Sequence, residues 1–66
     1  MYNSYKVPLR AFLPTLMRPI LAAQLRRIRG VVAASADDKE VVLYYKGLLD
    51  MRAITRFIRQ FEDKRL

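Results

Sequence analysis

The chain has 66 residues, of which 13 are Lys or Arg and 6 are Asp or Glu, so its formal net charge is +7. This length allows one small domain, residues 1–66, and no second lobe. The absence of Cys and His excludes disulfides, a Cys/His zinc site, and the thiolate and imidazole groups on which most catalytic sites depend.

The carboxylates are the remaining candidates for acid–base catalysis or for binding a hard cation. Asp37, Asp38 and Glu40 fall in a predicted turn, and Glu62 and Asp63 fall near the C-terminal end. The first group has neither the length nor the ligand spacing of a calcium loop, and a catalytic carboxyl needs a concave, partly dry site to shift its pKa. We therefore expect a protein that is not an enzyme and that uses no metal or cofactor.

The balance of 53% apolar and 29% charged residues is typical of a folded domain. The most apolar window, residues 7–25, contains two arginines and three prolines, so we expect no membrane span. Residues 1–36 hold six basic residues and no acid. Organelle transit peptides share that property, but Ser is scarce here and the prolines interrupt the amphipathic pattern. We expect a cytoplasmic protein, in keeping with the absence of Cys.

In chain order, residues 1–7 are predicted to form an extended arm or a short edge strand, because they show neither a helical pattern nor a capping residue. A helix is predicted over residues 15–29, with Pro19 near its start and Gly30 as its left-handed cap. Its apolar stripe consists of Leu13, Met17, Ile20, Leu21, Leu25 and Ile28. Gln24 falls within this stripe, either at its rim or in a hydrogen bond across an interface.

A β-hairpin is predicted over residues 31–45, where β-branched and aromatic residues flank a turn that contains Asp. Alternation along the second strand gives two apolar faces, one with Val41, Leu43 and Tyr45 and the other with Val42 and Tyr44. Because neither face is polar, we expect the helices to cover one face and a second subunit to cover the other. Val42 and Tyr44 are the predicted oligomer interface.

A second helix is predicted over residues 50–64, with Asp50 as its N-cap. Its apolar face consists of Met51, Ile54, Phe57, Ile58 and Phe61. These elements predict an α+β domain in which two amphipathic helices pack on one face of a two-stranded antiparallel ribbon. Since an isolated ribbon is marginally stable in water, we expect a homodimer or an obligate partner.

Arginine clusters are the candidate binding residues: Arg26, Arg27 and Arg29 in the acid-free part of the chain, and Arg52, Arg56 and Arg59 along the last helix. Guanidinium groups repeated along a surface can contact successive phosphates of a nucleic acid. The alternative interpretation is a solvated surface. Tyr44 and Tyr45 also suit the stacking of an unpaired base, but the interpretation that we favour puts Tyr45 in the core and Tyr44 in a dimer contact.

The sequence therefore predicts a small, basic, non-catalytic binding module, in the first place a nucleic-acid-binding or DNA-associated regulatory protein. It contains no nucleic-acid-binding motif of fixed spacing. The alternative is a protein-interaction module, such as a phage-type inhibitor or a toxin-neutralising immunity protein, that docks on an acidic partner. Tyr44, Tyr45, Lys46 and Gly47 before an amphipathic helix resemble part of some small immunity proteins. This resemblance covers less than half of the chain, and no residue role is carried over from it.

Overall fold

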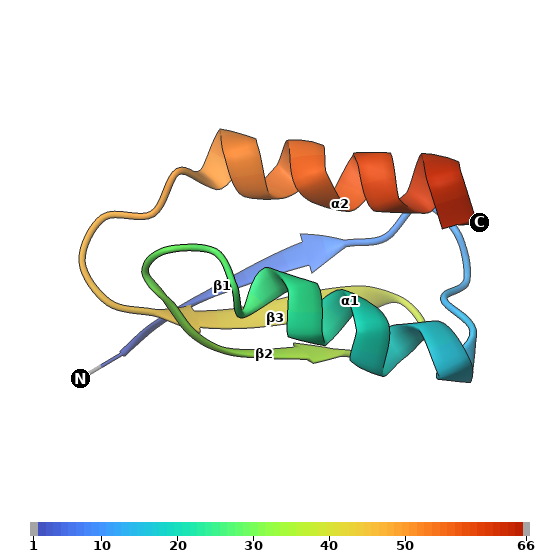
Figure 1. The fold of residues 1–66 in the computed structure, drawn as a ribbon, viewed down its shortest axis with the longest axis horizontal. Helices are drawn as coiled ribbons and strands as arrows, with labels where there is room; N and C mark the ends of the chain where they lie inside the picture. The colour runs from blue at the N-terminus through green and yellow to red at the C-terminus, as the bar shows by residue number, and fades with distance from the viewer. Residues whose placement is uncertain (1, 66) are drawn as a thin grey trace.

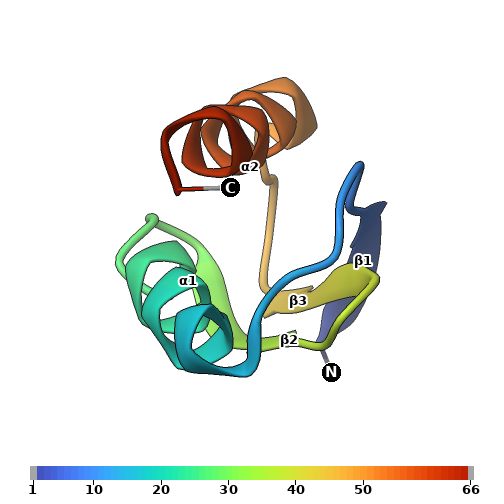
Figure 2. The ribbon, with the colours of Figure 1, turned by 90° about the vertical axis from the view of Figure 1, so that its right-hand side faces the viewer.

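The computed structural model describes residues 2–65 of the chain and the side chains of residues 2–64. Its elements are, in order, β1 (Asn3–Pro8), the short 3-10 helix η1 (Thr15–Met17), α1 (Arg18–Leu25), β2 (Val31–Ala36), β3 (Glu40–Tyr45) and α2 (Met51–Arg65). The strands form a 3-stranded antiparallel sheet in the order β1-β3-β2, and both helices cover the same face of it (Figures 1 and 2). The predictions of an α+β domain and of two helices on one sheet face are confirmed.

The prediction of a two-stranded ribbon is wrong, because β1 pairs with β3 along its whole length. The segment predicted as an arm or edge strand is therefore an edge strand. Alternation within it turns Val7, which is 2% exposed, and the half-buried Tyr5 toward the helices. Pro8 ends the strand. Proline has no backbone N–H to donate, and it is tolerated here because β1 is an edge strand, in which some N–H groups need no partner strand.

The connection from β1 through α1 to β2 passes over β3, which lies between the two strands that it joins (Figure 2). This arrangement is a split βαβ unit, to which α2 adds a second helix. β2 pairs with β3 with a register shift between Val31 and Ala33, so that Val32 forms a bulge and is 43% exposed.

The first helix is shorter than the predicted range 15–29. A 3-10 turn precedes the α-helix, and an irregular turn over residues 26–30 follows it and ends at Gly30 with φ 94°. Pro19 lies in the first turn of the helix, where no intrahelical partner is needed for an N–H. Gly30 thus has the predicted left-handed backbone, but it closes the turn rather than the helix itself.

The second helix agrees with its prediction. The carboxylate of Asp50 accepts a hydrogen bond from the backbone N–H of Ala53 at 3.1 Å, as an N-cap does. Among the described residues, no helix is long and apolar enough to cross a membrane.

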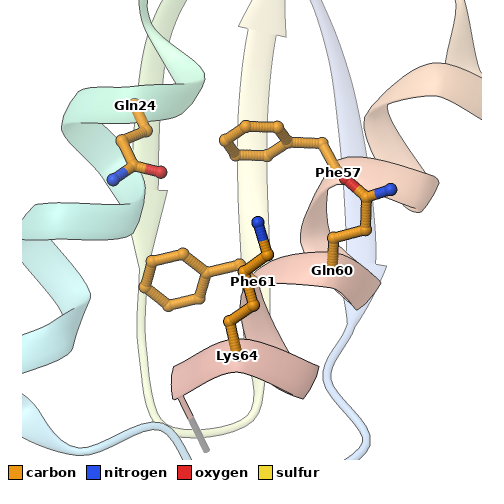
Figure 3. A pocket seen from close by; sticks show the side chains of 5 residues that line it. All are labelled: Gln24, Phe57, Gln60, Phe61 and Lys64. Atoms are coloured by element: carbon orange, nitrogen blue, oxygen red, sulfur yellow. The ribbon is translucent and has the colours of Figure 1, made fainter.

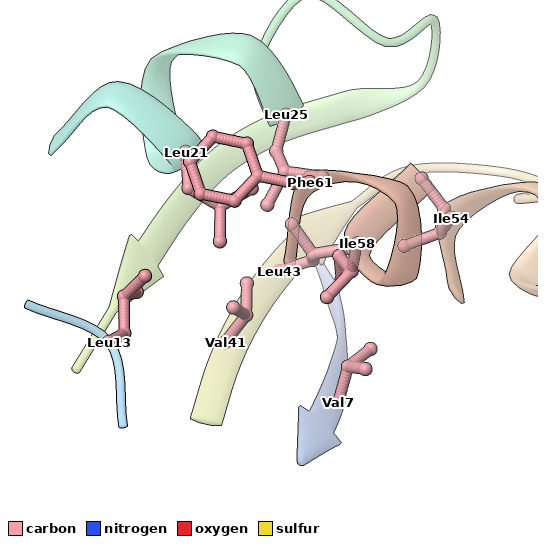
Figure 4. Close-up of a cluster of buried hydrophobic side chains, with 9 residues drawn as sticks. All are labelled: Val7, Leu13, Leu21, Leu25, Val41, Leu43, Ile54, Ile58 and Phe61. Atoms are coloured by element: carbon pink, nitrogen blue, oxygen red, sulfur yellow. The ribbon is translucent and has the colours of Figure 1, made fainter. Parts of the chain in front are cut away.

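The core lies between the sheet and the two helices (Figure 4). Its buried side chains are Val7, Leu13, Leu21, Leu25, Val41, Leu43, Ile54, Ile58 and Phe61. Each of these apolar side chains is at most 5% exposed, and burial of this kind is the main favourable contribution to stability. Ile20, which the sequence placed in the apolar stripe, is 38% exposed, because the stripe is wider than the surface that the sheet covers.

The turn between β2 and β3 is held by Asp37. Its carboxylate accepts hydrogen bonds from the backbone N–H groups of Lys39 and Glu40, each at 2.8 Å, and these bonds lower the pKa of Asp37 below its usual value. The connection between β1 and η1 is tied to the same turn, since the N–H of Leu13 donates to the carbonyl of Asp38 at 3.2 Å.

Candidate nucleic-acid interface

The fold separates charge along its long axis, which measures 32 Å against 19 and 18 Å for the other two. At the end where α1 stops and α2 starts (left in Figure 1) lie five basic residues, which we call the basic end: Arg26, Arg27, Arg29, Lys46 and Arg52. Asp50 is the acidic residue at this end. The other five of the six acids, Asp37, Asp38, Glu40, Glu62 and Asp63, lie at the opposite end, in the turn after β2 and in the last turns of α2.

The first three basic side chains come from the turn that follows α1. Arg26, Arg27 and Arg29 are all exposed. The turn is ordered by its own backbone, since the N–H of Arg26 donates to Ala22 at 3.1 Å and that of Arg27 to Gln24 at 3.2 Å. A backbone hydrogen bond from Lys46 to the carbonyl of Gly30, at 3.1 Å, joins this turn to the end of β3.

The other basic side chains of this region come from α2 and from the residue after β3. Arg52 and Arg56 are exposed and lie one helical turn apart, about 6 Å along the axis. Asp50, the nearest acid in sequence, caps the helix through Ala53. Within the described part of the chain, no ion pair joins Arg26, Arg27, Arg29, Arg52 or Arg56 to a carboxylate, so their charges are available to an external anion.

Arg59 is placed differently from the other predicted binding residues. Its side chain is 29% exposed, and its guanidinium donates to the carboxylate of Glu62 at 2.7 Å and to the backbone carbonyl of Pro8 at 3.0 Å. The bond to Pro8 attaches α2 to the end of β1, and the bond to Glu62 is an i,i+3 pair within α2. The row predicted along the helix is therefore divided: Arg52 and Arg56 face solvent, whereas Arg59 holds two parts of the fold together.

Glu62 is the centre of this attachment, and its side chain is 3% exposed. It also accepts hydrogen bonds from the backbone N–H of Arg10 at 2.7 Å and from its guanidinium at 3.2 Å. Burial acts to raise the pKa of Glu62, but the bonds from Arg59 and from the backbone and side chain of Arg10 outweigh it and leave the pKa lowered. The position of Glu62 in the sequence, near the C-terminal end, gives no indication of this buried ion pair.

The two residues predicted as an oligomer interface lie on the sheet face away from the helices. Tyr44 is 44% exposed there, and Val42 is half-buried. Tyr45 is half-buried on the opposite face but does not belong to the buried core, so the interpretation that put it in the core is wrong. The predicted division of the second strand into two faces is therefore confirmed, and among the described residues no element packs on the outer one (Figure 2).

Comparisons with protein-family models, characterised proteins and solved structures give no match.

A small groove lies between the two helices. It is lined by Gln24 of α1 and by Phe57, Gln60, Phe61 and Lys64 of α2, and its cavity volume is about 140 Å³ (Figure 3). Ligand sites usually have roughly 300–1,000 Å³, so this groove is too small for a nucleotide. Gln24 lies half-buried at the rim of the apolar stripe, which is one of the two placements that its sequence position allowed.

The described carboxylates do not form a metal site. No group of three His, Cys, Asp or Glu side chains within residues 2–64 is arranged to hold an ion. What the described geometry offers is a cluster of exposed guanidinium and ammonium groups, which donate hydrogen bonds in planar forks or as point charges to anions such as phosphate.

Proposed function

We propose that this protein is a small nucleic-acid-binding protein that contacts phosphates through its basic end together with Arg56. The observation that carries the proposal is the separation of charge: five basic side chains gather at one end with a single acid, and the other five acids lie at the far end. A net charge of +7 spread evenly would serve solubility alone. The basic end, with five basic residues against one acid, carries about +4 of this charge, whereas at the far end basic residues and acids nearly balance, so the basic end forms the field that attracts a polyanion.

The exposed arginines suit phosphate more than a chance surface does, for two reasons. Arg26 and Arg27 lie in a turn whose backbone is hydrogen-bonded, so little chain ordering is needed on binding. Neither they nor Arg52 must release a carboxylate of the described chain before they bind an anion. Each phosphate contact also releases a condensed counterion from the nucleic acid, which favours binding at low salt.

The proposal treats the protein as a monomer. The expectation of a dimer depended on the apolar outer face of β3 and on the instability of a two-stranded ribbon, and the second ground no longer applies, because β1 supplies the third strand and part of the core from the same chain. An independent sheet of three strands with helices on one face does not need a second copy for its stability. Val42 and Tyr44 are then part of an open face.

A matched pair of double variants tests the proposal. Arg26→Glu/Arg27→Glu and Lys39→Glu/Lys64→Glu each lower the net charge by four, from +7 to +3, the first at the basic end and the second at the other end. Binding of each to a fluorescein-labelled 12-nucleotide strand and a 12-base-pair duplex is measured by anisotropy at 50 mM salt. We expect the first variant to lose at least tenfold more affinity than the second.

Equal losses in the two variants would show that total charge rather than the basic end determines binding. A wild-type protein that fails to bind either nucleic acid at this salt concentration would contradict the proposal itself. The alternative function, docking on an acidic protein surface, would then be the interpretation to pursue, and a stoichiometric acidic protein partner that competes for Arg26 and Arg27 would establish it.

A further inference from the structure

The outer face of the sheet, turned away from both helices, combines an aromatic ring, a lysine and small side chains. Its residues are Ser4 and Lys6 of β1, Val42 and Tyr44 of β3, and Ala33 and Ser35 of β2. All of them are exposed except Val42, which is half-buried. The face is therefore an open surface of the fold, with its one large ring on the central strand.

Tyr44 is surrounded by the smallest side chains of this face. Ser4 of β1 lies directly across from it on one side and Ala33 of β2 on the other. Directly opposite residues in a sheet have Cβ atoms about 4.5–5.5 Å apart, so large neighbours would cover the ring. Ser and Ala cannot do so, and Tyr44 is 44% exposed on the central strand, where side chains are usually flanked on both sides.

A second exposed ring lies beside it at the basic end. Tyr2 is 52% exposed, and the ammonium group of Lys46 lies over it at 5.0 Å from the ring centre. Asn3 pairs with Tyr45, so Tyr2 and Lys46 are the next opposite positions, and Tyr2 is a diagonal neighbour of Tyr44 within reach of aromatic side chains. Lys46 therefore belongs both to the basic end and to the margin of the outer face.

We propose that the outer face binds single-stranded nucleic acid, with an unpaired base stacked on Tyr44 and phosphates contacted by Lys46 and Lys6. This inference depends on the proposed function and names its substrate class. An aromatic side chain on a sheet can reach the flat face of a base only when that base is not stacked in a duplex, and such stacking is tolerant of sequence. The lysines beside the ring supply the charge that the backbone of the strand requires.

A second copy of the chain is a poorer occupant of this face. In a two-fold symmetric contact the same patch of both copies meets, so Lys6 and Lys46 of one copy would approach those of the other in molecules that each carry +7. The apolar side chains that such a contact would bury are few: Val42, Tyr44, Ala33 and the bulged Val32, with Tyr2 at the margin. A polyanion removes this repulsion, whereas a second basic copy increases it.

The experiment uses Tyr44→Trp as a reporter, since the chain has no other Trp. Stacking of a base on the indole is expected to quench its emission when a 12-nucleotide thymidine strand is added, and a 12-base-pair duplex at equal phosphate concentration should quench it much less. In parallel, Tyr44→Ala should bind the single strand about 5- to 150-fold more weakly, whereas Tyr44→Phe, which keeps the ring, should stay within about twofold of the wild type.

Four controls keep the result specific. Phe12→Ala removes another exposed ring, 64% exposed and in the connection after β1, and should leave single-strand affinity unchanged. The slope of affinity against salt should be the same in Tyr44→Ala as in the wild type, because no phosphate contact is removed. Circular dichroism of each variant checks that the sheet is formed. Tyr44→Leu, which keeps the apolar bulk without the ring, should lose affinity for the single strand as Tyr44→Ala does.

The outcomes separate this inference from the proposed function. If Arg26→Glu/Arg27→Glu weakens binding but Tyr44→Ala and Tyr44→Leu do not, or if the duplex quenches Tyr44→Trp as strongly as the single strand, the stacking inference is overturned and the proposed function stands. If the wild type binds neither nucleic acid, both fail. A dimer in sedimentation equilibrium that Tyr44→Ala dissociates would give the face a different occupant and would also overturn the inference.

Discussion

Glu62 accepts hydrogen bonds from both the backbone N–H and the guanidinium of Arg10, a residue 52 positions earlier in the chain, at 2.7 and 3.2 Å. Arg59 completes the contact from within α2. The carboxylate therefore joins the segment that leaves β1 to the last turns of α2. Of all the described charged groups, this one is held most deeply in the fold, at 3% exposure of its side chain.

Replacement of Glu62 should destabilise the protein more than replacement of its neighbour Asp63. Glu62→Gln leaves two guanidinium groups without their buried anion. Because a hydrogen bond to a charged group contributes about 1.5–3 kcal/mol, the free energy of unfolding should fall by at least that amount. Asp63→Asn breaks a pair whose carboxylate is 68% exposed and should cost less than about 1 kcal/mol. Urea denaturation of the two variants measures the difference, and equal losses would contradict the structural role of Glu62.

The stabilising effect of Glu62 should depend on pH in one direction. Its pKa is lowered in the folded protein, so the unfolded chain binds the proton more readily and acid favours unfolding. The contribution is complete above the ordinary glutamate pKa of about 4.3 and is lost as the pH falls through the lowered value. We expect the difference in unfolding free energy between wild type and Glu62→Gln to be constant from pH 7 to about 5 and to shrink below that. A difference that stays constant to pH 3 would contradict this assignment.

Replacement of Arg56 should affect nucleic-acid binding and replacement of Arg59 should affect stability, although both residues lie on the same helix. Arg56→Ala removes an exposed charge and should reduce the slope of log affinity against log salt by about 1 with little change in stability. Arg59→Ala removes the bonds to Glu62 and Pro8 and should lower the unfolding free energy by about 1–2 kcal/mol, with an unchanged salt slope. Salt titration and urea denaturation of both variants provide the check. If Arg59→Ala has an unchanged stability and a reduced salt slope, Arg59 binds nucleic acid and has no structural role.

Because β1 is part of the sheet, replacements of two adjacent residues in it should differ in their effect on stability. Val7→Ala removes two buried methyl groups from the core and should cost about 1–3 kcal/mol. Lys6→Ala, on the outer face, should cost less than about 0.5 kcal/mol. Thermal or urea denaturation distinguishes the two. Similar, small losses would mean that β1 is a loose arm, as the two-stranded ribbon required.

The elements that local patterns determine could be predicted from the sequence. Helix α2 was predictable from its N-cap at Asp50 and its apolar spacing, and the two faces of β3 followed from the alternation of Val41 to Tyr45. These signals are properties of neighbouring residues, so no knowledge of the rest of the fold was needed.

The parts that depend on distant residues could not be predicted in the same way. In residues 3–8 the alternation of inward and outward side chains rests on Tyr5 and Val7 alone. This pattern is too short to predict that the segment joins the sheet. The pairing of Arg10 with Glu62 has no local signature, although Arg59 and Glu62 have the spacing of a helical ion pair. The gathering of arginines at one end also follows from topology, because the end of α1 and the start of α2 meet only in the folded chain.

The most direct test of phosphate binding is the salt dependence of affinity for a 12-nucleotide single strand. Six contacts, from the basic end and Arg56, predict a slope of log affinity against log salt of about −4, so that an increase from 50 to 200 mM salt should weaken binding about 250-fold. Arg26→Glu/Arg27→Glu should flatten this slope by at least about 1.4. A slope near zero, or one that this variant leaves unchanged, would contradict binding of nucleic acid by the basic end.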